Sequence, residues 1–202
     1  MEEYSTEMET RIVDAATKVF VVKGRKGASM QDIADEAGIN RTLLNYYFRS
    51  KDKLFDLIFD KVFLRFIPGV IELMKMNIPL NERLGKLVEI YFEALQSSPM
   101  APIFILHELT SNPEKLVETI KSRGIDPEEL IEQMKEEMAK GKIRQMDPKQ
   151  LIVSLLSLII FPFAAKPILM GILLRGDESE YQCFMEERKS FIKEYFITSI
   201  TK

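Results

Sequence analysis

The side chains between residues 41 and 53 are of the types that contact nucleic acids. Arginine pairs with O6 and N7 of guanine and asparagine with N6 and N7 of adenine, so Arg41 and Asn45, one helical turn apart, are candidates to read bases. The other residues expected to bind double-stranded DNA are Ser29, Gln31, Thr42, Tyr46, Tyr47 and Lys51. The last four of these have the hydroxyl and ammonium groups that hold phosphates.

Two short helices around a tight turn are predicted to position these side chains. Ser29 suits the N-cap of a first helix over residues 30–37. Gly38 can adopt the left-handed conformation that ends a helix, and Asn40 can cap the next one. In that second helix Leu44 faces inward, which leaves the candidate contact residues outward. The pattern is typical of a helix-turn-helix motif.

The charge distribution favours DNA over the alternative of a solvated polar face on an ordinary helical hairpin. The net charge is −3, yet residues 10–61 carry ten lysines and arginines against seven acidic residues. The first nine residues carry four acidic side chains and no basic one. Basic character therefore coincides with the motif, whose exposed tyrosines are followed by basic residues.

The residues across this segment occur in a recognisable order: Ile33-Ala34, Ala37-Gly38-Ile39, Leu44, Tyr46-Tyr47-Phe48, Ser50-Lys51 and Leu54, preceded by Phe20 and Gly24. This order resembles the N-terminal signature of the TetR family of bacterial transcriptional regulators, over about residues 10 to 60. Thr42, Leu43 and Asn45 depart from residues common in that family. These positions point outward, so the departures concern the operator sequence and not the motif.

The resemblance implies an all-α chain in which a three-helix DNA-binding domain is joined through a shared helix to a helical effector-binding and dimerisation domain. We expect the N-terminal arm and the helix-turn-helix domain over residues 1–51, and the second domain over residues 52–202. Residues 1–9 lack an apolar pattern and are expected to be a frayed arm.

Helical periodicity continues to the C-terminus, and no strand is needed to explain the pattern. A capping box is expected at Asp126-Pro127-Glu128-Glu129. The helices that we expect are 10–23, 52 to Pro68-Gly69, a short run to Met76, 82–96, 103–110, 114–122, 128 to about 140, 148–161 and 179–200.

Residues 151–174 form a mostly apolar stretch that could be taken for a membrane span. We interpret it as buried protein because Pro162, Lys166 and Pro167 interrupt it. A helix that is apolar all round must be covered on every side, which a partner subunit can do. The family resemblance likewise implies a homodimer held by the helices 148–161 and 179–200. We expect Leu155, in the middle of the first of these helices, to lie in the subunit interface.

Composition argues against several other classes of protein. The single cysteine, Cys183, cannot form an intramolecular disulfide, and the acidic N-terminus is unlike a secretory signal. We therefore expect the protein to be cytoplasmic and not to have a membrane as a partner. No cluster of metal-ligand type, phosphate-binding glycine loop or catalytic triad is evident. We therefore expect neither an enzyme nor a cofactor.

The resemblance also places an effector cavity among the helices after the fourth. The side chains expected to line it are Tyr91, Phe92, Leu95, Phe104, His107 and Met134, although each could equally belong to a solid core. Such a lining favours a small hydrophobic effector that is uncharged or weakly polar. The expected function is a repressor released from DNA by that effector; the alternatives are a DNA-binding dimer without an effector and a helical protein-interaction module.

Overall fold

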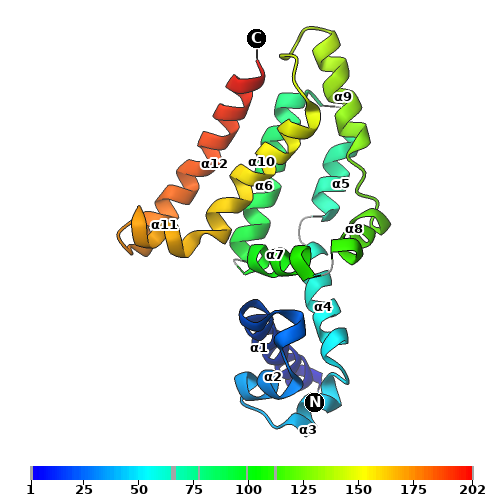
Figure 1. The fold of residues 1–202 in the computed structure, drawn as a ribbon, viewed down its shortest axis with the longest axis vertical. Coiled ribbons are helices and arrows are strands. Elements are labelled where there is room, and N and C mark those ends of the chain that lie inside the picture. Colours follow the sequence, from blue (N-terminus) through cyan, green and yellow to red (C-terminus); the bar gives the residue numbers. More distant parts are fainter. Residues whose placement is uncertain (1, 65–66, 77, 99, 112, 202) are drawn as a thin grey trace. The chain divides into compact units, whose positions relative to one another are not determined.

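The computed structural model describes residues 2–64, 67–76, 78–98, 100–111 and 113–201, which fold as α-helices (Figure 1). This described part contains no β-strand, and one isolated bridge pairs Ile143 with Thr201. The chain divides into two compact units. Unit 1 comprises Met1–Arg65 and Met100–Thr119, and unit 2 comprises Phe66–Pro99 and Ile120–Lys202.

Unit 1 is built around a helix that packs against three others. Its helices are α1 (Glu2–Gly27), α2 (Met30–Ala37), α3 (Arg41–Tyr47), α4 (Lys51–Leu64), α7 (Ala101–Ser111) and most of α8 (Pro113–Ser122). α1 contacts α2, α4 and α7. The ring of Phe55 lies 5.0 Å from that of Phe20 and stacks at 4.7 Å on that of Phe104. These buried rings join α1, α4 and α7 into one core.

This core explains why the division differs from the expected boundary at residue 52. Leu54, Phe55 and Ile58 of α4 are almost completely buried, and the rings packed on Phe55 come from α1 and α7. Apolar burial therefore assigns α4 and α7 to the N-terminal unit.

The start of α1 differs from the prediction. Residues 2–9, predicted to be a frayed arm, continue α1, which begins at Glu2. Glutamate is a good helix former and is favoured near a helix N-terminus, so a helix can extend there without an apolar stripe. At the other end, Gly24 interrupts the helical geometry with φ 65° and ψ 171°, as its position in the sequence predicted.

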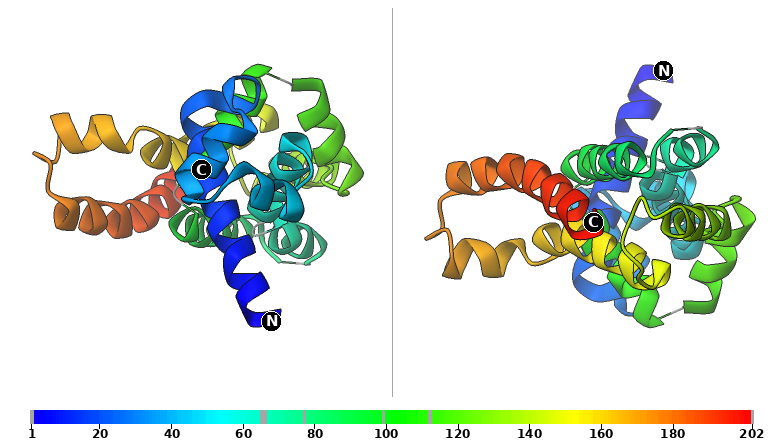
Figure 2. Two further views of the ribbon diagram at one scale, coloured as in Figure 1. Left: turned by 90° about the horizontal axis from the view of Figure 1, so that it is seen from below. Right: turned by 90° about the horizontal axis from the view of Figure 1, so that it is seen from above.

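Unit 2 is arranged around α6. Its helices are α5 (Ile67–Lys75), α6 (Leu80–Ser97), α9 (Glu128–Ala139), α10 (Pro148–Ala164), α11 (Lys166–Ile172) and α12 (Glu178–Ile200). α6 contacts α5, α9, α10 and α12, and it buries Leu84, Val88 and Phe92 at intervals of four residues. In both views of Figure 2, α12 returns alongside α10 and α11.

The apolar stretch 151–174 forms α10 and α11, and α10 runs through Pro162 to Ala164, three residues beyond the predicted end. A proline cannot bond the carbonyl four residues before it. Here that carbonyl, on Leu158, accepts a hydrogen bond from Arg188 Nη2 at 3.5 Å. In the described ranges no single helix is long and apolar enough to span a membrane; only α10 and α11 together reach that length, bent by 68°.

Two other helix ends differ from the predictions. α4 was expected to reach Pro68, but Pro68 lies in the first turn of α5, and residues 65–66 between the two helices are outside the described residues. The predicted capping box at the start of α9 is incomplete. Asp126 Oδ1 accepts the Glu128 N–H at 3.0 Å, and no side-chain cap bond is made at Pro127, which occupies the cap position.

Candidate nucleic-acid interface and effector cavity

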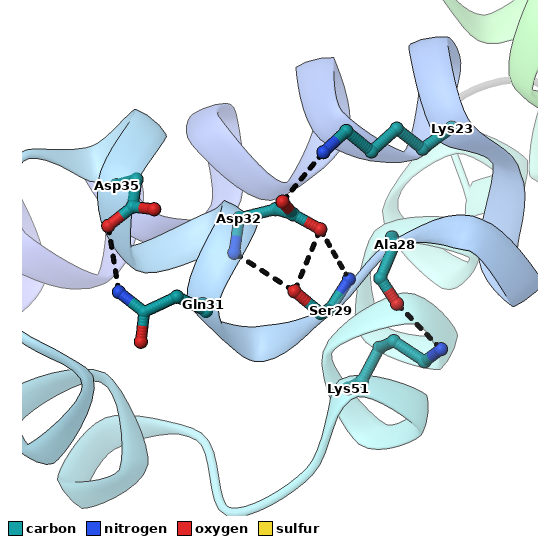
Figure 3. A network of polar contacts seen from close by, with 7 residues as sticks. All are labelled: Lys23, Ala28, Ser29, Gln31, Asp32, Asp35 and Lys51. Atoms are coloured by element: carbon teal, nitrogen blue, oxygen red, sulfur yellow. Dashed lines mark hydrogen bonds and ion pairs between the residues drawn. The ribbon is translucent and has the colours of Figure 1, made fainter.

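The start of α2 is fixed by a network of short polar contacts (Figure 3). The amide N–H of Asp32 donates to Ser29 Oγ at 3.1 Å, and the amide N–H of Ser29 donates to Asp32 Oδ2 at 2.9 Å. Lys23 Nζ lies 2.6 Å from Asp32 Oδ1. The bond from Lys23, followed by those from Ser29, lowers the pKa of Asp32 to about 2.

Ser29 and Gln31, both expected to contact DNA, have their donors engaged within this region. The Ser29 hydroxyl donates to Asp32 Oδ2 at 2.7 Å, and the Gln31 amide nitrogen donates to Asp35 Oδ1 at 2.8 Å. A hydroxyl has one proton to donate, so a bond from Ser29 to a phosphate would require it to leave Asp32. Gln31 keeps a second amide N–H.

The turn between α2 and α3 has the geometry that its sequence predicts. Gly38 has φ 64° and ψ 36°, its N–H donates to the carbonyl of Asp35, and the N–H of Ile39 donates to that of Ala34. A Cβ at position 38 would lie 2.7 Å from Arg11 Nη2. The left-handed conformation favours glycine here, and any larger side chain would also have to displace the end of the Arg11 side chain. Asn40 Oδ1 then caps α3 by accepting the N–H of Leu43 at 2.8 Å.

α3 presents most of the predicted contact residues to solvent. Leu44 is its buried side chain, and Arg41, Thr42 and Asn45 are exposed. Tyr46 is 80% exposed, while Tyr47 is half-buried and its ring meets that of Tyr46 edge-on at 5.4 Å. The structure thus brings arginine, asparagine, threonine and tyrosine groups together on one short helix.

Two basic residues near α3 have internal roles. Lys51 Nζ donates to the carbonyl of Ala28 at 2.8 Å, which ties the start of α4 to the loop before α2 (Figure 3). The ammonium retains two N–H groups for a phosphate. Arg25 pairs with Asp52 and Asp56 and lies over the ring of Phe55. Arg25 therefore joins α1 to α4.

Unit 2 contains an apolar cavity of about 280 Å³ between α5, α6, α9, α10 and the segment 120–127. Of the six residues predicted to line an effector site, Tyr91 and Met134 are in its wall. The full lining is Val70, Leu73, Met74, Arg83, Leu84, Leu87, Tyr91, Ile120, Ile125, Pro127, Leu130, Met134, Leu151, Ile152, Leu155 and Leu156.

The other four predicted lining residues pack elsewhere. Phe104 and His107 belong to unit 1: Phe104 stacks on Phe55, and His107 Nε2 lies 3.0 Å from the carbonyl oxygen of Val21. Phe92 meets the ring of Phe163 at 5.5 Å. Leu95 is 4% exposed and lies outside the cavity wall. Sequence periodicity identified these residues as buried but could not assign them to separate cores.

Arg83 is the charged side chain among the lining residues that sequence reasoning missed. Its side chain is 6% exposed and donates to the carbonyls of Met74 and Met76, and its Nε has no partner within the described residues. Arg83, Leu87 and Tyr91 are spaced by four residues along α6, which could have indicated a shared face. Burial raises the pKa of Tyr91 to about 12, so its hydroxyl stays protonated at neutral pH.

An apolar surface extends over α10, α11 and α12. The large side chains that are at least half exposed there are Val153, Phe161, Ile168, Ile172, Leu173, Phe191 and Tyr195. On α12 the rings of Phe191 and Tyr195 stack at 5.9 Å. Leu155, which was expected in a subunit interface, instead lines the cavity and is 2% exposed. The two faces of α10 are thus different: one lines the cavity and the other carries Val153 and Phe161.

The described residues do not bring together three or more His, Cys, Asp or Glu side chains in a way that could hold a metal ion. Within the described residues, the geometry offers a short helix, α3, with exposed polar side chains, and an apolar cavity whose lining includes two polar residues, Arg83 and Tyr91.

Residues 12–58 match the family model described as bacterial regulatory proteins, tetR family. The chain is 29% identical over 90 residues to the HTH-type transcriptional activator FasR of Mycolicibacterium smegmatis (strain ATCC 700084 / mc(2)155), a match that spans 45% of this chain and 41% of that protein. It is 24% identical over 195 residues, 93% of each chain, to the "Probable HTH-type transcriptional regulator YttP" of Bacillus subtilis (strain 168).

Solved structures share the fold over most of the chain. A mutant of HlyIIR superposes with a TM-score of 0.65 at 24% identity and covers 100% of both chains. AibR, determined in complex with isovaleryl coenzyme A and operator DNA, superposes with a TM-score of 0.61 at 20% identity, over 78% of this chain and 86% of that one.

Proposed function

By its N-terminal domain this chain is a member of the TetR family of bacterial transcriptional regulators, and we propose that it is a cytoplasmic repressor released from its operator by a small effector. The observation that carries the proposal is the construction of α3. Gly38 forms the turn before this helix, and Asn40 caps its first turn. Leu44 is its buried side chain. Its exposed residues are then free to enter a major groove.

We propose that Arg41 and Asn45 read bases, while Thr42, Tyr46, Tyr47 and Lys51 contact phosphates. The first pair can form bidentate bonds to purine edges. Tyr46 and Thr42 are exposed on the same helix, and Lys51 holds the loop before α2 while two of its N–H groups remain available. Ser29 contributes chiefly by fixing the start of α2, because its hydroxyl proton is engaged there. Gln31 bonds Asp35 through one amide N–H and has the second N–H available for a phosphate.

The active form in this proposal is a homodimer that places two copies of α3 in successive major grooves, about one helical turn apart. The apolar surface over α10 to α12 supports it. Exposed aromatic and aliphatic side chains gather there, notably Phe161, Phe191 and Tyr195, as is typical of surfaces that become buried on association.

Effector binding would be coupled to DNA release through α10. This helix contributes Leu151, Ile152, Leu155 and Leu156 to the cavity wall, and its opposite face belongs to the apolar surface. A ligand that fits the cavity better in one arrangement of α10 would shift the population of dimers toward it. The structure of AibR with both isovaleryl coenzyme A and operator DNA shows that a related fold can hold both kinds of ligand.

The proposal is tested with an operator selected from random duplex DNA. Asn45→Ala should weaken binding to that operator by about 1–3 kcal/mol and relax the preference at one base position. The matched control is Asn81→Ala, an exposed asparagine at the start of α6, which should leave both quantities unchanged. Equal losses on the operator and on random DNA would refute base reading by Asn45.

Lys51→Ala gives the complementary result. It should weaken binding to all sequences alike and make the dependence of log K on log salt shallower by about one. Because Lys51 also bonds the carbonyl of Ala28, the melting temperature must be measured on the same variant. A full salt slope in a folded Lys51→Ala protein would remove Lys51 from the phosphate contacts.

A further inference from the structure

Arg83 is an unusual residue in the wall of the unit 2 cavity. It is 6% exposed, and the other wall residues are apolar except for Tyr91. A buried guanidinium is costly unless a negative charge and a full set of hydrogen bonds compensate it. How Arg83 is compensated therefore indicates what the cavity is built to receive.

The compensation is incomplete among the described residues. Both hydrogen bonds of Arg83 go to backbone carbonyls, those of Met74 and Met76, at the C-terminal end of α5. That end of a helix carries a partial negative charge of only about half a unit. Arg83 Nε is buried and has no partner within this part of the chain. The buried Nε–H and part of the positive charge are thus left without a counterpart in the described part of the chain.

We infer, on the basis of the effector-binding function proposed above, that the effector is an amphipathic monocarboxylate whose chain fills the cavity and whose carboxylate pairs with Arg83. A carboxylate can accept two parallel hydrogen bonds from a guanidinium, and Arg83 has its Nε–H and a second hydrogen on each Nη to offer. The sequence favoured an uncharged or weakly polar effector because the burial of Arg83 was not visible there.

The cavity also sets the size of the ligand. A volume of about 280 Å³ corresponds to roughly nine water molecules at about 30 Å³ each. An eight-carbon carboxylate, with ten non-hydrogen atoms, is of this size. Octanoate is therefore a suitable probe, and 1-octanol and octylamine share its chain but differ in the head group.

A second set of acceptors lines a surface depression that Arg83 also borders. They are the carboxylates of Glu129, Glu132 and Glu136 of α9 and the buried Oε1 of Gln133, which has no partner among the described residues. If one of these carboxylates turns to pair with Arg83 in solution, the cavity loses its cationic end. It would then take neutral chains as readily as charged ones.

The experiment is a calorimetric titration of the full-length protein with the three probes. The wild type should bind octanoate at least tenfold more tightly than 1-octanol, and octylamine most weakly. Arg83→Met should lose the preference for octanoate while keeping its affinity for 1-octanol. Lys86→Met, which removes a positive charge from the outer part of the same helix, should behave like the wild type.

The outcomes distinguish failure of the carboxylate assignment from failure of the proposed effector-binding function. Equal wild-type affinities for octanoate and 1-octanol, or a preference for octanoate that survives in Arg83→Met, would overturn the carboxylate assignment and leave an apolar effector site standing. Octanoate binding that depends on Arg83 but leaves operator affinity unchanged would overturn the proposed regulation alone. Failure of all three probes to bind would overturn both.

If Arg83→Met does not fold, Arg83→Lys replaces it. Lysine keeps the charge but cannot offer the paired N–H groups of arginine. Its octanoate affinity should fall by about tenfold, a loss of about 1.4 kcal/mol, with unchanged affinity for 1-octanol. Unchanged affinity for both probes would overturn the pairing.

Discussion

Asp32 determines how the start of α2 responds to acid. Its folded-state pKa of about 2 is below the ordinary value of 3.8 because Lys23 and then Ser29 donate to its carboxylate. A carboxylate with a lowered pKa stabilises the folded state fully above its unfolded pKa. That contribution is lost as the pH falls from about 3.8 through about 2.

We therefore predict that carboxyl-detected NMR will give a titration midpoint near 2 for Asp32. In Lys23→Met the midpoint should rise, because the largest cause of the shift is removed, yet stay below 3.8 while the Ser29 donors remain. Lys18→Met removes another exposed lysine of α1, one paired with Glu36 instead, and should leave the Asp32 midpoint unchanged. An Asp32 midpoint that does not move in Lys23→Met would show that Lys23 does not hold this carboxylate.

Single residues were predictable when their partners were near in sequence. Ser29, Gly38 and Asn40 act on groups within four residues of themselves, so their types and positions sufficed. Arg83 and His107 could not be assigned in this way. His107 contacts the carbonyl of Val21, 86 residues away, and the unpaired Nε of Arg83 depends on how α5 and α9 cover α6.

At the scale of the element, α10 shows how one helix can serve two purposes. Its apolar residues lie all around, so the sequence could not say which side faces a partner. The structure distinguishes Leu155, which is 2% exposed, from Phe161, which is 61% exposed. Charge at these two positions should have different effects.

We predict that Phe161→Glu will be a folded monomer with weak operator binding, because it places a charge in the proposed subunit interface while remaining solvated in the monomer. Leu155→Glu should instead destabilise each subunit by several kcal/mol, since it buries an unpaired charge. Sedimentation velocity and thermal melting on both variants distinguish the two effects. A dimeric Phe161→Glu protein with wild-type operator affinity would exclude this face as the interface.

The positions of the helices could be predicted from hydrophobic periodicity, whereas the residues at which the helices end were predicted less well. Two ends differ for reasons that sequence patterns do not contain. α10 passes Pro162, and the carbonyl that this proline leaves unbonded receives Arg188 from α12. α1 extends to Glu2 through a segment rich in glutamate, a good helix former, that has no apolar stripe. In both cases periodicity marked where a helix must bury a face, not how far it continues.

At the scale of the whole molecule, the structure has an apolar cavity in unit 2, and only Tyr91 and Met134 of the six predicted effector-site residues line it. The sequence suggested Leu95 as a lining residue, whereas the structure places Leu87 in the wall and Leu95 in solid packing. The two leucines lie on the same helix two turns apart. They form a matched pair for a test of free volume.

We predict that Leu87→Trp will fill the cavity, keep a melting temperature near that of the wild type and lose binding of octanoate and 1-octanol. Leu95→Trp should overpack the core and cost about 1–3 kcal/mol of stability, with probe binding retained in the folded fraction. Melting curves and titrations on the two variants decide between cavity and core. A strongly destabilised Leu87→Trp protein would mean that no usable space lies beside Leu87.

The all-α class and the helix-turn-helix domain were predictable because both rest on local patterns. The membership of α7 was not. An apolar helix must be buried, but its sequence does not say against which neighbour, and Phe104 belongs to the same aromatic cluster as Phe20 and Phe55.

That membership has a consequence for anyone who wishes to recombine this regulator with another sensor. The DNA-binding unit consists of two separate stretches, Met1–Arg65 and Met100–Thr119, so it is not a contiguous cassette. A chimera joined at residue 65 would lack Phe104 and so leave the aromatic cluster incomplete. The expected loss of folding stability is comparable to that from truncating a buried phenylalanine, about 3–5 kcal/mol. A workable graft must therefore keep α7. This requires two further junctions, one on each side of α7, so the foreign sensor is inserted into the host gene as two fragments.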